Sequence, residues 1–318
     1  MNKYENKKVL LIAGGGTLGT YVSKELIRLG CCVEVICPEE KVSDNERLFF
    51  HQSYATYELL KELFAKTHYD GIVNFLHYRD LEEYKKAHRL LINNTDHLVF
   101  LSSYRVYADE QHPITESAPR LYDVTDDEEF LADEDYAVPK SKCEDFLNNE
   151  CKGEAWTIVR PVISFSSRRL DLLLYSGRDV LDYAARKEEM ILPEIVKDFS
   201  AGIDWAGNSG KLIANLLFKK EAIGESFTIY SGHGLTWGEV ADIYSELIGV
   251  KIRWCEENEY VNNTPKIKKS PWIWKYDRRF NRDVDASKVL AVTGLNKEDF
   301  ATVSDGIKIE LDILEESK

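Results

Sequence analysis

The chain has 318 residues, of which 44% are hydrophobic and 30% charged, and its formal net charge at pH 7 is −14. This length and composition are typical of a globular protein with one large α/β domain, or such a domain with a smaller second lobe. An acidic surface repels nucleic-acid phosphates, so we expect no nucleic-acid partner. No stretch approaches the roughly 20 apolar residues that a membrane span needs, so we expect no membrane partner.

The N-terminal segment MNKYENKK is polar and leads directly into an apolar run, so we expect no signal peptide and a cytoplasmic location. The six cysteines include no C-x-x-C pair and are interpreted as reduced thiols, which fits the cytoplasm. The seven histidines lack the spacings of metal ligands, so we expect no metal.

The first half of the chain alternates short apolar runs with amphipathic segments. In chain order we expect a strand at 8–14, a helix at 18–29, strands at 31–37 and 47–51, a helix at 55–66, a strand at 70–76, a helix at 80–93 and a strand at 97–103. Such alternation predicts βαβ units, and hence a doubly wound, Rossmann-type parallel sheet with helices on both faces.

The rhythm changes at 109–135, where 11 acidic residues and two prolines predict a long loop. This loop either closes over a site or is simply solvated. A helix at 136–150 and a strand at 156–162 follow, and later a strand at 224–232 precedes a helix capped by Thr236. We therefore assign 1–162 to the Rossmann domain. We assign 163–318 to a smaller mixed α/β substrate lobe, interleaved with the last elements of the main sheet.

The glycine run IAGGGTLG follows the first strand and opens the first helix. Gly14, Gly16 and Gly19 satisfy G-x-G-x-x-G in the context that this motif requires. The first glycine permits a tight turn, the second lets the backbone approach a pyrophosphate, and the third lets the helix pack on the strand. The helix N-terminus, with the N–H groups of Thr17 and Leu18, then faces the phosphates. The run predicts a dinucleotide site.

The choice of cofactor rests on the end of the second strand, VEVICPEE. An NAD site usually places an acid there to hold the ribose hydroxyls. Cys37 occupies the expected position, and Glu39 and Glu40 come slightly later. Lys41 and Arg47 are near enough in sequence to receive the 2′-phosphate of NADP. We favour NAD, with NADP as the alternative.

A second group of residues suits acid–base chemistry. In YAVPK, Tyr136 and Lys140 are four residues apart and share one helical face. A lysine ammonium favours the phenolate and lowers the pKa of a tyrosine, which would let Tyr136 exchange protons near neutral pH. The strand FLSSYRVYA places serines at its carboxyl end, beside the crevice where ligands bind in such sheets.

With these motifs the sequence resembles the extended short-chain dehydrogenase/reductase superfamily, in particular the NAD-dependent epimerase/dehydratase family, over nearly its whole length. The similar segments are IAGGGTLG, LSSYRVYA, YAVPK, VRP at 159–161, KDFSAGIDWAG, GESFTIYSGHGLTWGEVA and the late DASK, TGL and SDGIKIEL. The resemblance implies Ser103, Tyr136 and Lys140 as the catalytic set, with Ser102 beside it. In this set Tyr136 is the acid/base, Ser103 polarises the reacting oxygen, and Lys140 tunes Tyr136 and holds the cofactor.

Three departures from the family pattern bear on the substrate. Tyr104 and Arg105 occupy the positions of an Asp-Glu pair that dehydratases use, which argues against dehydration. Ile163 stands where an asparagine is usual, and Lys197 replaces a phosphate-binding arginine, keeping the charge without the bidentate fork.

The segment 251–282 holds nine Lys and Arg together with several aromatic residues. There, Arg278, Arg279 or Arg282 could meet a phosphate, and Trp272, Trp274 or Tyr276 could stack on a ring. Alternatively, the segment packs on the small lobe. Arg105 either meets an anion at the site or pairs with the acidic loop.

These observations favour an NAD(P)-dependent dehydrogenase, reductase or epimerase. It would transfer hydride at a carbinol or carbonyl carbon of a sugar nucleotide or another anionic, phosphorylated metabolite. The alternative is a non-catalytic member of the fold that senses cofactor or binds RNA. The resemblance also implies a homodimer formed through the helices at 80–93 and 136–150.

Overall fold

The computed structural model describes residues 3–316. The predicted Rossmann domain (1–162) and substrate lobe (163–318) extend beyond this range by Met1 and Asn2 and by Ser317 and Lys318. The centre of the molecule is a seven-stranded sheet in the order β10-β6-β5-β4-β1-β2-β3, and every neighbouring pair is parallel. The strands are β1 (Lys8–Ile12), β2 (Cys32–Cys37), β3 (Leu48–Gln52), β4 (Gly71–Asn74), β5 (Leu98–Leu101), β6 (Trp156–Pro161) and β10 (Glu225–Ile229). This is the Rossmann-type α/β fold that the alternation predicts.

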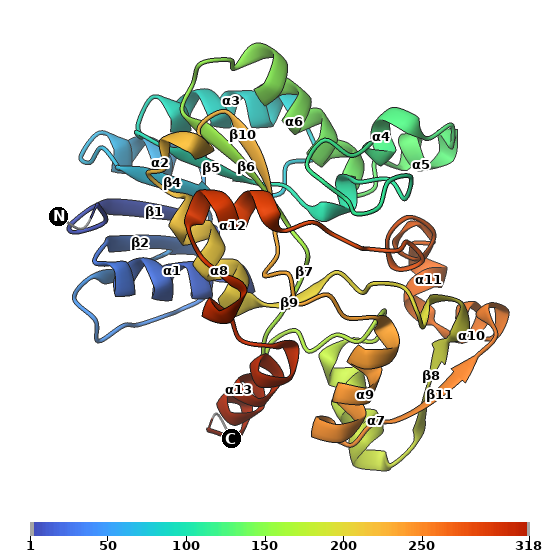
Figure 1. The fold of residues 1–318 in the computed structure, drawn as a ribbon. Coiled ribbons are helices and arrows are strands. Elements are labelled where there is room, and N and C mark those ends of the chain that lie inside the picture. Colours follow the sequence, from blue (N-terminus) through green and yellow to red (C-terminus); the bar gives the residue numbers. More distant parts are fainter. Residues whose placement is uncertain (1–2, 317–318) are drawn as a thin grey trace.

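Helices cover both faces of the sheet (Figure 1). One face carries α1 (Thr17–Leu29), α8 (Ala206–Leu216) and α12 (Ser287–Thr293); the other carries α2 (Tyr57–Phe64), α3 (Leu81–Ile92) and α6 (Ala137–Glu150). Strand β1 shows why. Val9 and Leu11 join the core on the α1 side, whereas Leu10 and Ile12 join the core on the α2 side. Successive side chains of a strand point to opposite faces, so a strand buried on both sides must be apolar throughout.

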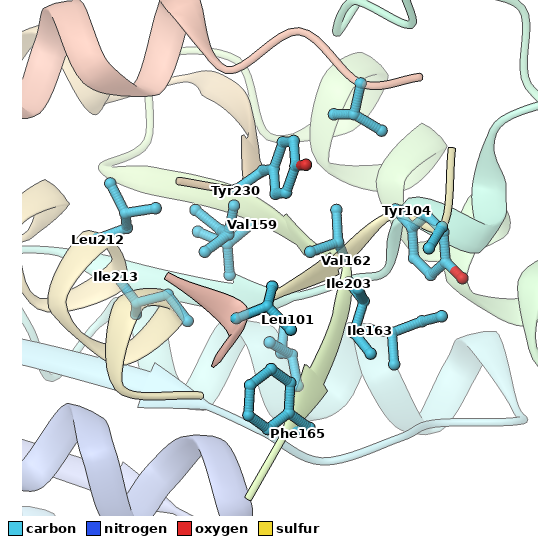
Figure 2. Packing of buried hydrophobic residues seen from close by; sticks show 14 of the residues in the cluster. Leu101, Tyr104, Val159, Val162, Ile163, Phe165, Ile203, Leu212, Ile213 and Tyr230 are labelled. Carbon is cyan, nitrogen blue, oxygen red and sulfur yellow. The ribbon is translucent and has the colours of Figure 1, made fainter. Parts of the chain in front are cut away.

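The larger core joins the sheet to α8 and to the start of the second lobe. Figure 2 shows Leu101 and Val159 of the sheet near Leu212 and Ile213 of α8, with Phe165 below them. Each of these side chains is buried. The core therefore continues from the main sheet into the segment where the chain leaves it.

After β6 the chain builds a smaller lobe and then returns to the sheet. Strands β7 (Ile163–Phe165) and β9 (Ile203–Trp205) form one parallel pair, and β8 (Glu189–Pro193) and β11 (Lys251–Cys255) form another. Around the second pair lie α7 (Gly177–Arg186), α9 (Trp237–Ile248), α10 (Glu257–Asn263) and α11 (Pro265–Lys269), and α13 (Val303–Glu316) ends the chain (Figure 1). The capping box at Thr236 and Glu239 starts α9 at the residue that its sequence pattern predicts.

The acidic segment 109–135 is not one long loop. It contains the short helices α4 (Leu121–Val124) and α5 (Glu128–Asp133), and Phe130 of α5 is buried against Trp272 and Tyr276, with ring centroids 5.6 and 4.7 Å away. Helices of four to six residues carry too little periodicity to be recognised in a sequence. The partner segment, 251–282, supplies the aromatic surface that orders them.

These two segments also pair by charge and hydrogen bond. Lys275 lies 2.5 Å from Asp127, and the Tyr276 hydroxyl donates to the same carboxylate at 2.6 Å. The Trp272 indole donates to Asp133 at 2.6 Å. The acidic and the basic-aromatic segments therefore bind each other, which neither pattern indicates alone. In the described part of the chain, no helix is long and apolar enough to cross a membrane.

Candidate active site

The glycine loop forms a tight turn between β1 and α1. A Cβ on Gly19 would clash with the main chain of Gly14, and one on Gly14 would lie 2.7 Å from Cβ of Leu11. A Cβ on Gly16, in contrast, would meet no atom within 4 Å. Gly14 and Gly19 are thus required by packing, whereas the bare backbone at Gly16 faces open space where a ligand can approach.

Ala13, just before the glycine run, adopts a backbone conformation that is unfavourable for alanine. Its φ is +56°, in the left-handed region that disfavours any residue with a Cβ. The family that the sequence resembles has a glycine here. The turn therefore keeps its geometry at a cost in backbone strain.

Ser103, Tyr136 and the start of α1 share one small cavity of about 100 Å³. Its walls include Thr17, Leu18, Ser102, Ser103, Tyr136 and Arg169. Ser103 caps a short turn after β5 and accepts a hydrogen bond from the Arg105 amide at 3.2 Å. Tyr136 immediately precedes α6. Carboxyl ends of parallel strands meet at one edge of a sheet, so residues distant in sequence converge here.

Lys140 is 1% exposed and is held by main-chain carbonyls. Its ammonium donates to the carbonyl oxygens of Leu101 and, at 3.3 Å, of Leu76, and lies 5.7 Å from the centroid of the Tyr136 ring. Burial lowers the pKa of Lys140 to about 8. The lysine thus joins the ends of two neighbouring strands beneath the tyrosine.

Burial raises the pKa of Tyr136, and the charges that oppose this shift are those of Arg105 and Arg169. The Arg105 guanidinium lies 5.3 Å from the centroid of the tyrosine ring. Lys140 remains the residue expected to tune Tyr136, and the charges of Arg105 and Arg169 act on the phenol as well. The phenol is consequently protonated at neutral pH.

Arg169 and His77 are two site residues that the sequence analysis missed. The His77 ring packs against Tyr136 in a tilted arrangement, with centroids 4.7 Å apart and planes inclined by 34°. Burial and the nearby cations Lys140, Arg79 and Arg105 lower the pKa of His77 to about 4, so it is neutral at pH 7. His77 follows β4 and Arg169 follows β7. The only sequence signal for these two residues was their position just after a strand. No motif contains them.

The predicted substrate residues Arg278 and Arg282 are buried and already bonded within the protein. Both pair with Asp277, and Arg278 also donates to the Tyr104 hydroxyl at 3.0 Å. Although burial opposes it, Arg278, Arg105 and Arg282 hold the pKa of Asp277 below its ordinary value. These two arginines therefore bind groups of the protein itself and do not present free guanidinium groups for a phosphate.

Of three other predicted residues, Ser102 and Arg105 lie at the site and Lys197 does not. Arg105 pairs with Asp135 at 2.7 Å and approaches Asp277 at 3.4 Å, so it binds the acidic segment while remaining over Tyr136. Ser102 lines the cavity and is buried. Lys197 lies in the smaller lobe, 3.6 Å from Glu194 and over the Trp254 ring, away from the residues that line this cavity.

The segment after β2 returns to the glycine loop. A Cβ on Gly15 would lie 2.7 Å from the Glu39 carboxylate, and Lys41 donates to the Gly15 carbonyl oxygen at 2.5 Å. Arg47 points elsewhere, toward the Gly30 carbonyl and Glu5. Cys37, Glu39 and Lys41 therefore lie against the loop, whereas Arg47 does not.

No protein-family model matches the sequence, and a search of curated proteins finds no match. Solved structures with the same fold are found. The epimerase Mth375 from Methanothermobacter thermautotrophicus has a TM-score of 0.73 at 15% identity, over 97% of this chain and 92% of that one. UDP-N-acetylglucosamine 4-epimerase from Bacillus cereus has a TM-score of 0.65 at 19% identity, over 96% and 99%.

The Bordetella bronchiseptica enzyme WbmG, solved in complex with NAD and UDP, has a TM-score of 0.69 at 14% identity, over 98% of this chain and 95% of that one. The chain is thus similar over 96–98% of its length to these three structures, two of which are named as epimerases. At these identities the likeness establishes the fold. The resemblance drawn from the motifs is confirmed at that level.

Proposed function

We propose that this protein is an NAD(P)-dependent oxidoreductase or epimerase that exchanges hydride at a carbinol or carbonyl carbon of a sugar nucleotide or similar anionic metabolite. One observation carries the proposal: a single cavity brings Ser103 and Tyr136 to the start of α1, directly beside the glycine loop. Donors for a reacting oxygen and a phosphate-binding helix terminus are therefore adjacent.

The glycine loop fits a dinucleotide. The open space at Gly16 admits a pyrophosphate against the backbone, and the first N–H groups of α1 are free to donate to it. Glu39, whose carboxylate lies against Gly15, would bind the ribose hydroxyls, which favours NAD. When bound, the nicotinamide supplies the acceptor and donor of hydride.

The residues of the cavity have complementary roles in this proposal. Tyr136, with its raised pKa, holds a proton that it donates to a carbonyl oxygen, and Ser103 donates a second hydrogen bond to the same oxygen. Lys140, fixed by the carbonyls of Leu76 and Leu101 beneath Tyr136 and outside the cavity lining, would hold the cofactor ribose. Arg169 is half exposed at the cavity and suits an anionic group of the substrate.

The solved structures support the proposal. WbmG was solved with NAD and UDP, and the protein from Bacillus cereus is named as a UDP-N-acetylglucosamine 4-epimerase. Helices α3 and α6 are the expected dimer surface, and Tyr136 precedes α6, so dimerisation would be linked to the site. The alternative, a cofactor sensor or RNA-binding protein, is disfavoured for RNA by the net charge of −14.

The first test is the nucleotide content of the purified protein, by absorbance and fluorescence at about 340 nm and by mass spectrometry after denaturation. Retained NAD indicates an epimerase, which recycles its cofactor. An empty site that binds NADH or NADPH reversibly indicates a dehydrogenase or reductase. Binding of neither dinucleotide overturns the proposal.

Tyr136→Phe tests the catalytic part. We expect unchanged dinucleotide affinity and a loss of turnover of about 100-fold or more, because the proton donor is removed. Tyr54→Phe is the matched control, since Tyr54 is 75% exposed. Unchanged turnover in Tyr136→Phe would assign the proton transfer to another group.

A further inference from the structure

Three side chains that can bind a metal ion meet near the amino end of β6. His88 lies on α3, Cys151 directly follows α6, and Glu154 lies in the turn that leads into β6. One ligand atom from each side chain lies within 4.8 Å of the other two. Ser103 and Tyr136 lie at the opposite, carboxyl ends of the strands, so this cluster is separate from the candidate active site.

The imidazole of His88 is enclosed by the protein but only partly bonded to it. The side chain is 1% exposed, and its Nε2 lies 2.6 Å from a carboxylate oxygen of Glu154. Among residues 3–316, the other ring nitrogen, Nδ1, is buried and has no hydrogen-bond partner. Buried polar atoms are nearly always paired with protein, water or an ion. The unpaired nitrogen therefore indicates, independently of the cluster, that protein groups alone leave the ring unsatisfied.

The turn at 151–154 presents its two ligands together. The Glu154 amide donates to the Cys151 carbonyl oxygen at 3.2 Å, and the Trp156 indole donates to the same oxygen at 2.8 Å. Gly153, with φ +87°, takes the left-handed conformation that the turn requires. Burial raises the pKa of the Cys151 thiol to about 12, and the adjacent Glu154 carboxylate adds to this shift. The spacing Cys-x-x-Glu matches the two-residue separation of ligands in many zinc-binding turns.

The charges around the cluster favour a cation. Cys151 is the C-cap of α6, at the negative end of the helix dipole, and α6 has no basic residue in its last turn. The charge of Arg89 opposes a cation there, but its side chain is exposed and therefore screened by solvent. At longer range, the net charge of −14 attracts cations to the protein.

We propose that His88, Cys151 and Glu154 bind a divalent transition-metal ion, and that Zn²⁺ suits them best. Imidazole, thiolate and carboxylate are all zinc ligands, whereas Mg²⁺ and Ca²⁺ take oxygen ligands. Tetrahedral zinc holds nitrogen and oxygen ligands about 3.3 Å apart, and a sulfur about 3.6 Å from each. Glu154 is 40% exposed, so its carboxylate can move outward from His88 to admit the ion. Cys151 would release its thiol proton to solvent, and water would fill the fourth position.

No metal is expected from the sequence, because the histidines lack the spacings of metal ligands. His88 and Glu154 are 66 residues apart, so only the fold brings them together. A bound ion would join α3, the end of α6 and the start of β6. The inference does not depend on the proposed function, because none of the three ligands belongs to the candidate active site.

The experiment uses the untagged full chain after removal of metals with a chelator. Zn²⁺ binding is measured by calorimetry for wild type, Cys151→Ser and Glu154→Gln, and thermal unfolding shows whether each variant is folded. Co²⁺ serves as a second probe, because a thiolate ligand gives it a charge-transfer absorption band. The control is His68→Asn: His68 and Asp96 form a similar pair at 2.8 Å, but among the described residues they belong to no cluster of three ligands.

We expect one Zn²⁺ per wild-type chain and a thiolate band with Co²⁺ that Cys151→Ser abolishes. Changing a residue that merely supports a metal ligand costs about 10-fold to 100-fold in affinity, so loss of a ligand should cost about 100-fold or more. Zn²⁺ should raise the unfolding temperature of wild type and of His68→Asn but not of the two cluster variants.

The inference is overturned if wild type binds no Zn²⁺, or if folded Cys151→Ser and Glu154→Gln bind it as tightly as wild type. If Cys151→Ser does not fold, Glu154→Gln decides, because its exposed side chain can change with little effect on the core. Dinucleotide binding is no part of these measurements, so failure of the proposed function would leave their outcome unchanged.

Discussion

Replacing Gly16 with alanine separates a glycine needed for folding from one needed for a ligand. Gly16 has φ −79° and ψ −171°, which alanine adopts without strain, and a Cβ there meets no atom within 4 Å. Gly→Ala at a compatible position gains roughly 0.4–1 kcal/mol through the unfolded state. Alanine is poorer than glycine at a helix N-cap by several tenths of a kcal/mol or more. These effects largely cancel, so we expect the free energy of unfolding to change by less than about 0.5 kcal/mol.

The same methyl group would occupy the space through which a pyrophosphate approaches the backbone. We expect the affinity for NADH to fall at least tenfold, which is about 1.4 kcal/mol. Urea unfolding and NADH fluorescence titration measure the two effects separately. Gly19→Ala is the comparison, because its Cβ clashes with the Gly14 main chain and should destabilise the fold by about 1–3 kcal/mol. Normal NADH affinity in a folded Gly16→Ala protein would refute the placement of the pyrophosphate.

Three further predictions concern stability and are checked by urea unfolding. Ala13→Gly should raise the free energy of unfolding by about 1 kcal/mol, because it removes a Cβ from a residue with φ +56°; no gain would mean that the turn is unstrained. Asp277→Asn should lower it by about 3–5 kcal/mol, since the buried charges of Arg105, Arg278 and Arg282 lose their shared carboxylate; a near-neutral effect would contradict that network. The pKa of Lys140 is lowered to about 8 from its ordinary 10.5, so between these values the unfolded state binds more protons. The penalty is full below pH 8, and stability should rise by up to about 3 kcal/mol across this window relative to Lys140→Met, whereas parallel pH curves would show no shift.

The order of strands and helices in the first half was predictable because each element carries its own signal. A strand buried on both faces is apolar at every position, as in Val9–Ile12, and each helix that follows has a hydrophobic stripe. The glycine loop was also readable, since its spacing and its place after a strand are both local. The structure adds that Gly16 alone among the three motif glycines faces empty space.

The interior contacts of the charged segments were not predictable in the same way. Arg278 and Arg282 look like free cations in a basic stretch, yet both pair with Asp277, and the distant Tyr104 hydroxyl accepts a hydrogen bond from Arg278. Likewise the acidic segment resembles a solvated loop until Phe130 is seen against Tyr276. Charge counts describe a segment, whereas pairing depends on which segments the tertiary structure brings together.

Four residues around the candidate site share a topological origin. Gly16 follows β1, His77 follows β4, Ser103 follows β5, and Arg169 follows β7, which continues directly from β6. The carboxyl ends of parallel strands lie at one edge of the sheet. A fold of this type therefore brings the turns and polar side chains that follow its strands together at that edge. What distinguishes this chain is the charge it gathers at that edge: arginines that oppose the pKa shift of Tyr136 on one side of the glycine loop, and Lys41 with Arg168 on the other. The net charge of −14 means that the distant surface repels an anionic ligand. The cations on both sides of the loop must therefore attract such a ligand at short range, where direct contacts outweigh that screened repulsion.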